Sequence, residues 1–397
     1  MNSVFISPHF PPNYYHFVVR LRQCGANVFG LADAPWDSLH AELRQHLTEY
    51  YRVSNLHNYD ELVRAMGYLT HKYGKLDHLD SHNEYWLETE AQLRTDFNIS
   101  GIKLDEVPKI TRKSRMKETF QQAGVKTARG RVCRTEEEVR NLIDEIGYPV
   151  VVKPDIGVGA AHTFTMRDSA DFQKLRHEWP PGDCMVEEFV RGRIVTFDGL
   201  ADARGNVVFC GSLAYSKGVM EAVREDSDIY YTATADILPE VENAGRATLR
   251  AFNVRARFFH FEFFQTESGE VLGIEVNIRP PGGLTLDMYN YLFDFDCYRM
   301  WAEMIVHGVS KPVSRRKGCV IYVGRKDHIR YAMSHEQVVD RFRPSLMHYE
   351  RMSPVFATAL GNEGYILRDD GDGPLLEAAE FIQRRTAIQG GRAHAAA

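Results

Sequence analysis

Hydrophobic and polar residues alternate most regularly in two neighbouring stretches of the chain, residues 258–264 and 273–279. Side chains along a β-strand point to opposite faces in turn, so this period of two predicts two strands. The segment Glu267-Ser268-Gly269-Glu270 between them is typical of a hairpin turn. We therefore expect an antiparallel hairpin, with one polar and one apolar face on each strand.

The polar faces of this hairpin carry the candidate chemistry. His260 and Glu262 share a face of the first strand, and Glu275, Asn277 and Arg279 share a face of the second. Pairing the strands would bring two carboxylates, an amide oxygen and a guanidinium to one place. Hard oxygen ligands beside an arginine suit a magnesium-bound polyphosphate. An ordinary exposed hairpin with two glutamates remains the alternative on this pattern alone.

The apolar faces of the same strands favour the first interpretation. They carry large hydrophobic residues that we expect to be buried: Phe259, Phe261, Phe263, Ile274, Val276 and Ile278. If the apolar face of the hairpin packs on a core, the polar face cannot also line a core. We therefore expect the polar face to line a cleft. His260 stands beside an aromatic run, so both a structural role and contact with a substrate stay open for it.

The N-terminal region has the pattern of an α/β unit. Residues 2–7 predict a strand, residues 14–24 a helix and residues 28–31 a second strand. A dinucleotide-binding unit would carry GxGxxG after the first strand, whereas here Ser7-Pro8-His9-Phe10-Pro11-Pro12 follows. We therefore expect a scaffold that shapes one wall of a cleft and binds neither nicotinamide nor flavin.

A second candidate for phosphate binding lies in the middle of the chain. A helix predicted from Thr135 to Gly147 is followed by a β-branched strand, residues 148–154, in which Lys153 is the penultimate residue. A small-residue turn with Gly157 and Gly159 comes next. A lysine there can place an ammonium group near phosphate oxygens, although a surface lysine would look the same. Further along, Asp287 to His307 predicts one long helix.

Composition narrows the function classes. A net charge of −6 without any dominant run of lysine or arginine argues against a nucleic-acid surface. Six cysteines without a CxxC pair disfavour a disulfide framework or a zinc site and fit a reducing cytoplasm. There is no apolar run of membrane-spanning length and no signal-like N-terminal order, so we expect a cytoplasmic protein with small-molecule partners, no nucleic acid and no membrane.

Taken in order, these signals resemble the ATP-grasp superfamily, in particular its carboxylate–amine ligases and their biotin carboxylase and carbamoyl phosphate synthase relatives. The resemblance covers residues 1–310, most specifically 105–285. It implies that ATP phosphates bind Lys113 and Lys153, with Gly157 and Gly159 in the covering turn. It implies that adenine binds the hinge, whose residues are Glu187, Glu188, Phe189 and Val190. It implies Mg²⁺ or Mn²⁺ on Glu262, Glu275 and Asn277, with Arg279, and with it His260, as the catalytic candidates.

The resemblance also implies an architecture of mixed α/β and α+β class. We expect an N-terminal Rossmann-like domain (1–110), an ATP-grasp domain (111–310) with a lid at about 115–190, and a C-terminal α/β subdomain with a flexible tail (311–397). Two features depart from the family. Ile194 stands where an acidic ribose contact is common, and the turn after Lys153 has few glycines. The ribose contact is therefore left unassigned.

The function implied is an ADP-forming ligase that joins a carboxylate to an amine through an acyl phosphate. Two other functions stay open. One is a bicarbonate-activating enzyme of the carboxylase or carbamoyl phosphate type, although no biotin-carrier segment is evident. The other is a nucleotide-binding member without turnover, which the complete Glu262, Glu275 and Asn277 set disfavours. The substrates are not named by any motif, and a homodimer remains open.

Overall fold

The structure is a computed structural model that describes residues 1–157, 163–175, 182–309, 311–313 and 318–386. The chain divides into two compact units. The first comprises Met1–Leu213, Asp236–Gly282 and Phe295–Arg315, and the second comprises Ala214–Ala235, Gly283–Asp294 and Arg316–Ala397. The expected division into three consecutive domains stays a prediction, and the expected flexible tail at 390–397 lies outside the described residues.

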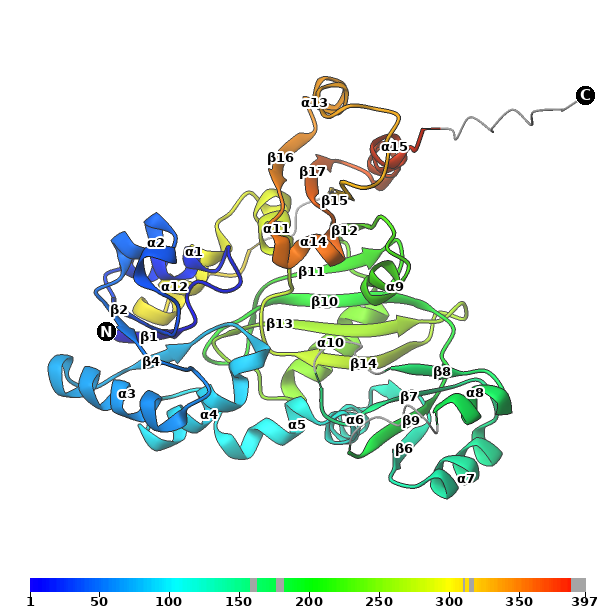
Figure 1. The fold of residues 1–397 in the computed structure, drawn as a ribbon, viewed down its shortest axis with the longest axis horizontal. Helices are drawn as coiled ribbons and strands as arrows, with labels where there is room; N and C mark the ends of the chain where they lie inside the picture. Colours follow the sequence, from blue (N-terminus) through cyan, green and yellow to red (C-terminus); the bar gives the residue numbers. More distant parts are fainter. Residues whose placement is uncertain (158–162, 176–181, 310, 314–317, 387–397) are drawn as a thin grey trace, which may run out of the picture. The chain divides into compact units, whose positions relative to one another are not determined.

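The first unit opens with the expected α/β region (Figure 1). Its four strands are all parallel, in the order β3-β2-β1-β4. The strands are β1 Asn2–Ile6, β2 Asn27–Ala32, β3 Glu49–Arg52 and β4 His78–Asp80. The helices of this region are α1 Tyr15–Gln23, α2 Ala41–His46, α3 Tyr59–Tyr73 and α4 Leu87–Asp96, with short 3-10 turns η1 Trp36–Ser38, η2 Glu84–Trp86 and η3 Leu104–Glu106. Parallel strands joined by helices confirm the α/β class predicted here.

The expected hairpin is the centre of the second sheet of this unit. Within the unit the strand order is β11-β10-β13-β14-β5. These strands are β5 Lys126–Thr127, β10 Arg193–Ala201, β11 Val207–Tyr215, β13 Arg257–Gln265 and β14 Val271–Asn277. The turn closes where predicted, since Thr266 N donates to Glu270 O at 2.9 Å and Gly269 N to Thr266 O at 2.9 Å.

The pairing of β13 with β14 is antiparallel and contains a bulge. Glu262 lies opposite Glu275 and His260 opposite Asn277, but Phe263 lies opposite Gly273. Ile274 is the extra residue, and it is only half-buried, whereas Val276 and Phe263 are almost fully buried as predicted. The bulge interrupts the alternation at this one position, which is why the prediction of burial fails for Ile274.

A third, antiparallel sheet follows the order β6-β9-β7-β8. It consists of β6 Gly130–Cys133, β7 Val150–Pro154, β8 Phe164–Met166 and β9 Cys184–Glu188, with the helices α7 Glu136–Ile146 and α8 Ser169–Leu175. Helix α7 begins at the predicted cap, where Thr135 Oγ1 accepts from Glu138 N at 3.2 Å. The remaining helices of the first unit are α5 Val107–Thr111, α6 Lys113–Gln122, α10 Pro239–Ala251 and α12 Cys297–His307.

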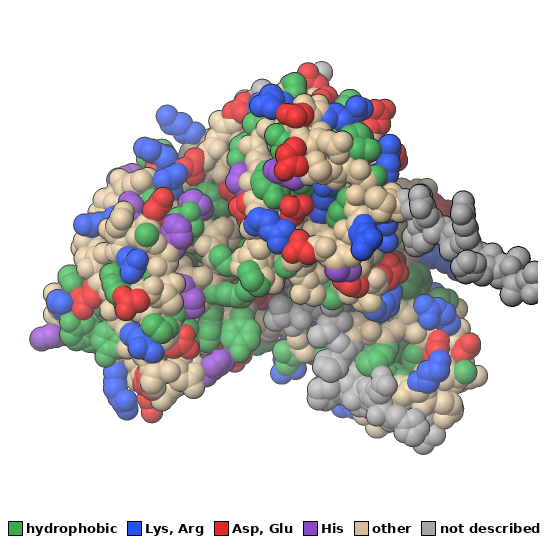
Figure 2. Space-filling view, turned by 45° about the horizontal axis from the view of Figure 1, so that its top comes forward, with side chains coloured by type: hydrophobic (Ala, Val, Ile, Leu, Met, Phe, Trp, Pro, Cys, Tyr) green, Lys and Arg blue, Asp and Glu red, His purple; other side chains and the backbone are tan. Residues whose placement is uncertain are grey.

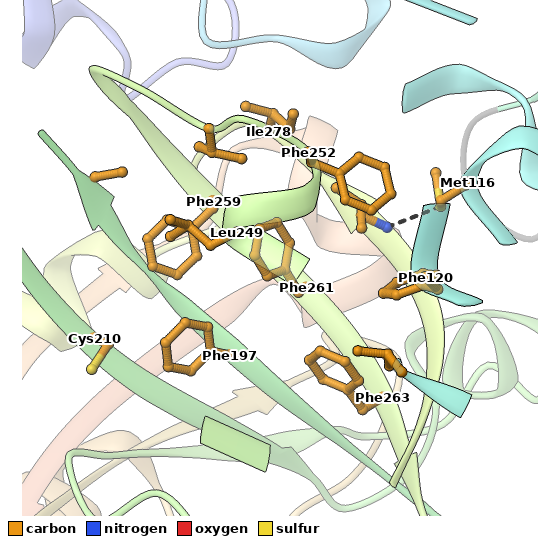
Figure 3. Packing of buried hydrophobic residues seen from close by; sticks show 14 of the residues in the cluster. Met116, Phe120, Phe197, Cys210, Leu249, Phe252, Phe259, Phe261, Phe263 and Ile278 are labelled. Carbon is orange, nitrogen blue, oxygen red and sulfur yellow. Dashed lines mark hydrogen bonds between the residues drawn. The ribbon is translucent and has the colours of Figure 1, made fainter. Parts of the chain in front are cut away.

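Helices α6 and α10 cover the apolar face of the hairpin (Figure 3). Phe259, Phe261 and Phe263 of β13 are fully buried there. The backbone of β14 meets α6 directly, because Val276 N lies 3.1 Å from Met116 Sδ. A Cβ added at Gly273 would lie 2.8 Å from the ring of Phe120, so only glycine lets α6 approach β14 this closely.

The second unit has its own core and its own antiparallel strands, in the order β16-β17-β15-β12. Its elements are α9 Val219–Arg224, β12 Tyr230–Thr234, α11 Thr285–Phe293, β15 Cys319–Arg325, α13 His335–Phe342, β16 Leu346–Arg351, α14 Pro354–Leu360, β17 Glu363–Asp369 and α15 Asp372–Gln383.

The prediction of a single helix over residues 287–307 is wrong, because the structure has two helices there. Helix α11 ends at Asp294, which is left-handed with φ 53°, and α12 starts after a new cap, where Asp296 accepts from Arg299 N at 2.9 Å. Short polar side chains tolerate the left-handed conformation and cap helices, so two aspartates end one helix and begin the next.

The face of the molecule drawn in Figure 2 carries mixed charge. On the face in Figure 2, acidic and basic side chains are interspersed and no large field of one sign is visible. Among the described residues, no helix is long and apolar enough to cross a membrane.

Two helical glycines give a matched test of the packing. A Cβ at Gly245 in α10 would lie 2.3 Å from the ring of the fully buried Phe197, whereas a Cβ at the exposed Gly67 in α3 would meet nothing within 4 Å. Gly245→Ala should lower the free energy of unfolding by about 1–3 kcal/mol through overpacking. Gly67→Ala should raise it by about 0.5–1 kcal/mol, because alanine loses less backbone entropy. Urea unfolding of both variants measures this, and equal effects of the two would contradict the packing of α10 on β10.

Candidate active site

Two carboxylates face each other across the hairpin. Glu262 of β13 and Glu275 of β14 occupy directly opposed positions, and Asn277 lies next to them with 3% of its surface exposed. Burial raises the pKa of Glu275 to about 7, and the neighbouring charges of Glu262 and Glu84 add to this effect. The face predicted from the alternation is therefore assembled, and it concentrates negative charge.

His260 lies beside this pair and is bonded on both sides. Its Nδ1 lies 2.7 Å from Asp198 Oδ1 and its Nε2 lies 3.1 Å from Glu262 Oε1. Burial by itself would lower the pKa of His260, but Asp198 and then Glu262 outweigh it and raise the pKa to about 10. The same ring helps to hold the pKa of Glu262 below its usual value, against the effect of burial. Asp198 could not be found by motif, because it lies on β10 rather than on the hairpin.

Arg279 closes the other end of the face. Its Nε and Nη2 each lie 3.2 Å from Glu84 Oε2, its Nη1 donates to Pro280 O at 3.0 Å, and its Nη2 reaches Asn277 Oδ1 at 3.4 Å. Burial tends to lower the pKa of Arg279, but Glu84 outweighs this and raises it. A small pocket is lined by these groups and their neighbours, which include Asn83, Glu84, Asn277 and Arg279. Glu84 was missed, because nothing in its local sequence connects it to residue 279.

The lysines approach from α6 and β7. Lys153 Nζ lies 2.6 Å from Glu187 Oε2, and Lys117 Nζ lies 2.6 Å from Glu187 Oε1. The two ammonium groups outweigh burial and hold the pKa of Glu187 below its usual value. Lys117 was missed, although its position one helical turn after Lys113 was a usable signal.

Lys113 is placed by the start of its helix. Ser114 N and Ser114 Oγ both bond to Asp155, at 2.7 and 3.0 Å, and Lys113 N donates to Asp155 O at 2.9 Å. The Lys113 ammonium donates to Gly157 O at 3.1 Å. Burial lowers the pKa of Lys113, and the nearby charge of Glu275 opposes this. Lys113, Lys153 and Glu275 therefore act on one another electrostatically. Gly159 lies outside the described residues.

The expected hinge separates its two glutamates. Glu187 faces the lysines, whereas Glu188 Oε2 lies 2.7 Å from Arg129 Nε. Phe189 N donates to Pro149 O at 3.0 Å, and 42% of Phe189 is exposed. Val190 is half-buried. The side chain of Glu187 is thus committed to the lysines, and the Phe189 ring is the exposed apolar surface of the segment.

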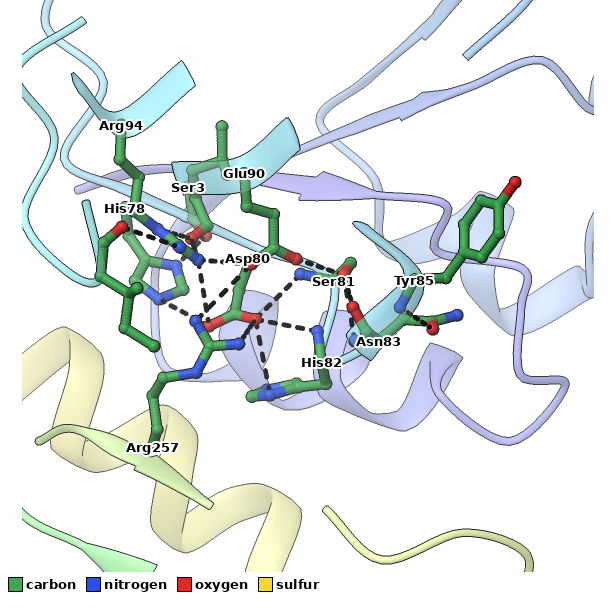
Figure 4. A network of polar contacts seen from close by, with 12 residues as sticks. Ser3, His78, Asp80, Ser81, His82, Asn83, Tyr85, Glu90, Arg94 and Arg257 are labelled. Atoms are coloured by element: carbon green, nitrogen blue, oxygen red, sulfur yellow. Dashed lines mark hydrogen bonds and ion pairs between the residues drawn. The ribbon is translucent and has the colours of Figure 1, made fainter. Parts of the chain in front are cut away.

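A buried polar network ties the N-terminal region to β13 (Figure 4). Asp80 Oδ1 accepts from Arg257 Nη2 at 3.0 Å, and Glu90 Oε2 accepts from Arg94 Nη2 at 2.6 Å. Asp80, Glu90 and Arg94 are at most 2% exposed and Arg257 is 5% exposed. Arg257 begins the strand that carries His260 and Glu262, so this network fixes one end of that strand.

The donor set fits a hard divalent cation. Glu262, Glu275 and Asn277 supply two carboxylates and one amide oxygen, the chemistry that Mg²⁺ prefers. Within the described residues no cluster of three or more His, Cys, Asp and Glu side chains could hold a metal ion, so this part of the chain offers no competing site of that kind.

Sequence comparison relates the chain to known proteins. A sequence profile of the ATP-grasp domain matches residues 146–287. The L-arginine-specific L-amino acid ligase of Bacillus subtilis is 24% identical over 221 residues, which is 53% of this chain and 53% of that protein. The chain thus spans about half the length of this curated relative.

Solved structures share the fold. The L-amino acid ligase from Bacillus licheniformis superposes with a TM-score of 0.71 at 14% identity, covering 96% of both chains. The biotin carboxylase domain of the Hydrogenobacter thermophilus 2-oxoglutarate carboxylase, in complex with MgADP, ADP and bicarbonate, has a TM-score of 0.64 at 17% identity, covering 93% of this chain and 86% of that one. Their shared architecture is the ATP-grasp fold. The chain is therefore similar to ATP-grasp domains over residues 146–287, and the proteins that it resembles include two named as L-amino acid ligases.

The raised pKa of Glu275 predicts a pH-dependent effect on stability. In the metal-free protein the folded-state pKa of Glu275, about 7, lies above its ordinary value of 4.5, so the folded form binds the extra proton and stability falls as the pH rises through this window. Glu275→Gln removes the charge. Its Tm should exceed that of the wild type at pH 8 by at least about 2 °C, roughly the effect of 1 kcal/mol on a large domain, and the difference should vanish near pH 5.

Thermal melts in EDTA at both pH values measure this effect. Glu267→Gln, at an exposed position of the same hairpin, controls for the loss of one carboxylate. A Tm difference that is the same at pH 5 and pH 8 for Glu275→Gln would contradict the electrostatic description of the site.

Proposed function

We propose that this protein is an ATP-dependent carboxylate–amine ligase that forms an amide or peptide bond through an acyl phosphate and releases ADP and phosphate. The observation that carries the proposal is the polar face of β13 and β14, where Glu262, Glu275, Asn277 and Arg279 lie together. Lys113 and Lys153 lie close enough to Glu275 to influence its charge. Carboxylates, an amide and several cations in one place suit a metal–triphosphate complex.

The chemistry follows from the poor reactivity of a carboxylate. Its oxygen becomes a leaving group when the γ-phosphoryl group of ATP is transferred to it, which breaks the bond to ADP and forms the acyl phosphate. The amine then attacks the acyl carbon, phosphate leaves with the former carboxylate oxygen, and the amine loses a proton. Binding both reactants in one site makes each displacement effectively unimolecular.

Each group of residues has a role in this proposal. Lys113 and Lys153 offset the charge of the triphosphate, and Lys117 holds Glu187 so that Glu187 positions Lys153. The backbone of 187–190 and the exposed Phe189 ring receive adenine. Glu262, Glu275 and Asn277 would hold Mg²⁺ or Mn²⁺, which would neutralise negative charge on the triphosphate. Arg279 binds the substrate carboxylate or the transferred phosphoryl group, because its planar guanidinium can pair with two oxygens at once.

The relatives favour amino acids as substrates to test first, since two of them are named as L-amino acid ligases. A second candidate is a bicarbonate-activating reaction, which the bicarbonate-bound neighbour supports. The first reaction requires both a carboxylate and an amine for ADP formation, whereas the second requires bicarbonate.

The reaction class can be tested by measuring the products formed and by following an isotope label from the carboxylate to phosphate. ADP and phosphate should form only when a cognate carboxylate and amine are both present, in a screen of amino acids and small carboxylates. With ¹⁸O in the carboxylate, one labelled oxygen should appear in the released phosphate. ADP formation with bicarbonate alone would support the second candidate, and normal turnover without label transfer would exclude the acyl phosphate.

The phosphate-binding role of Lys153 can be tested by binding alone. Lys153→Ala should weaken ATP affinity about 10- to 100-fold, the usual cost of losing a charged hydrogen bond. Lys126→Ala is the matched control, because Lys126 is an exposed lysine of the same unit that pairs with Glu270. Calorimetry measures both, and an unchanged affinity for Lys153→Ala would refute the assignment.

A further inference from the structure

We propose that His260 is a positioning residue, and that it acts with Asp198 to hold the carboxylate of Glu262 in the orientation that binds the divalent cation. The inference rests on the proposed function, because it assigns a role toward the metal ligands of that site. Of the two roles that the sequence left open for His260, a structural role and contact with a substrate, it favours the first.

The geometry runs across two paired strands. Asp198 of β10 lies directly opposite His260 of β13, and Glu262 follows two residues later on the same face. The imidazole therefore lies between two carboxylates, at 2.7 Å from Asp198 Oδ1 and 3.1 Å from Glu262 Oε1. Each ring nitrogen is therefore engaged by a carboxylate oxygen, and neither is left for a substrate.

Asp198 is itself held by the backbone of the next strand. Its Oδ2 accepts from Thr196 Oγ1 at 2.7 Å, and Thr196 Oγ1 accepts from Leu213 N at 2.8 Å. Thr196 and Asp198 are fully buried, and His260 is 5% exposed. The chain of bonds thus leads from the backbone of β11 to Glu262 without an exposed link. Rotation of the ring would break a buried hydrogen bond, which keeps its orientation fixed.

Glu262 is left with one oxygen for a cation. His260 engages Oε1, and among the described residues no hydrogen bond or ion pair engages Oε2. A carboxylate pinned through one oxygen presents the other in a single direction. Partners of this kind commonly determine metal affinity even though they do not touch the metal.

The test compares how much the metal contributes to nucleotide binding in each variant. For each protein, calorimetry gives the Kd of a non-hydrolysable ATP analogue with Mn²⁺ and without metal in EDTA, and the ratio isolates the metal's contribution. His260→Gln should reduce the metal's contribution about 10- to 100-fold and leave metal-free binding unchanged. Asp198→Asn, which changes the partner of His260 on the side away from Glu262, should reduce it in the same direction. Thermal melts confirm that each variant is folded, and Asp198→Asn decides the question if His260→Gln is not.

A double-mutant cycle separates positioning from direct contact. If His260 acts through Glu262, the double variant H260Q/E262Q should bind Mn²⁺–analogue no more weakly than E262Q alone. Additive losses would show that His260 acts independently and would overturn the proposal.

A second pair in the chain provides the matched control. His348 and Glu350 of β16 are likewise two residues apart, with Nε2 and Oε2 at 3.0 Å, and they belong to the second unit. His348→Gln should leave the ratio unchanged, and a loss equal to that of His260→Gln would overturn the proposal. If E262Q alone keeps the wild-type ratio, the metal assignment of the proposed function fails. If E262Q loses it while H260Q and D198N do not, only the positioning inference fails.

Discussion

The site depends on one unfavourable contact, the direct opposition of Glu262 and Glu275 across an antiparallel pair. Like charges at such positions repel, and partial burial makes the repulsion stronger because less water screens it. Cationic side chains lie near the two carboxylates and offset their negative charge. They are His260 on the same strand as Glu262, Lys113 and Lys153 on α6 and β7, and Arg279, which follows Asn277. These groups offset burial and repulsion only in part, since burial and then the charge of Glu262 still raise the pKa of Glu275 to about 7. A divalent cation between the carboxylates would be a natural complement to such an arrangement.

Each cation in turn is fixed by a bond to something more rigid. Asp155 bonds the first turn of α6 and so places Lys113, Glu187 spans Lys117 and Lys153, and Glu84 holds Arg279. The strand that carries Glu262 is itself tied at Arg257 to the buried carboxylate of Asp80. Charged side chains are long and lose much entropy when they are ordered, so a site assembled from them gains precision from partners that are already held by backbone.

Much of the site could be predicted from the sequence. The residues that were missed are those whose positions do not follow from a local pattern. Alternation was enough to place Glu262, Glu275 and Asn277 on one surface, because strand geometry is periodic. It could not reveal the bulge at Ile274, since an extra residue leaves the hydrophobic pattern intact. Asp198 and Glu84 could not be predicted for another reason, because each contacts a partner that is distant in the sequence. Asp198 is 62 residues from His260, and Glu84 is 195 residues from Arg279. The break at Asp294 was readable in principle, because Asp296 is a typical cap, but the apolar spacing on both sides concealed it.

The close packing of α6 on β14 brings the positive and negative parts of the site together. The ring of Phe120 rests on Gly273 and Met116 Sδ meets the backbone of Val276, so the helix that carries Lys113 packs through these two side chains directly on the strand that carries Glu275. The packed ring of Phe120 therefore acts as a rigid spacer between the element that carries the positive charge and the element that carries the negative charge. The spacing of these two elements does not depend on the flexible ends of the charged side chains. Natural variation at residue 273 should accordingly be far narrower than at the exposed turn a few residues before it.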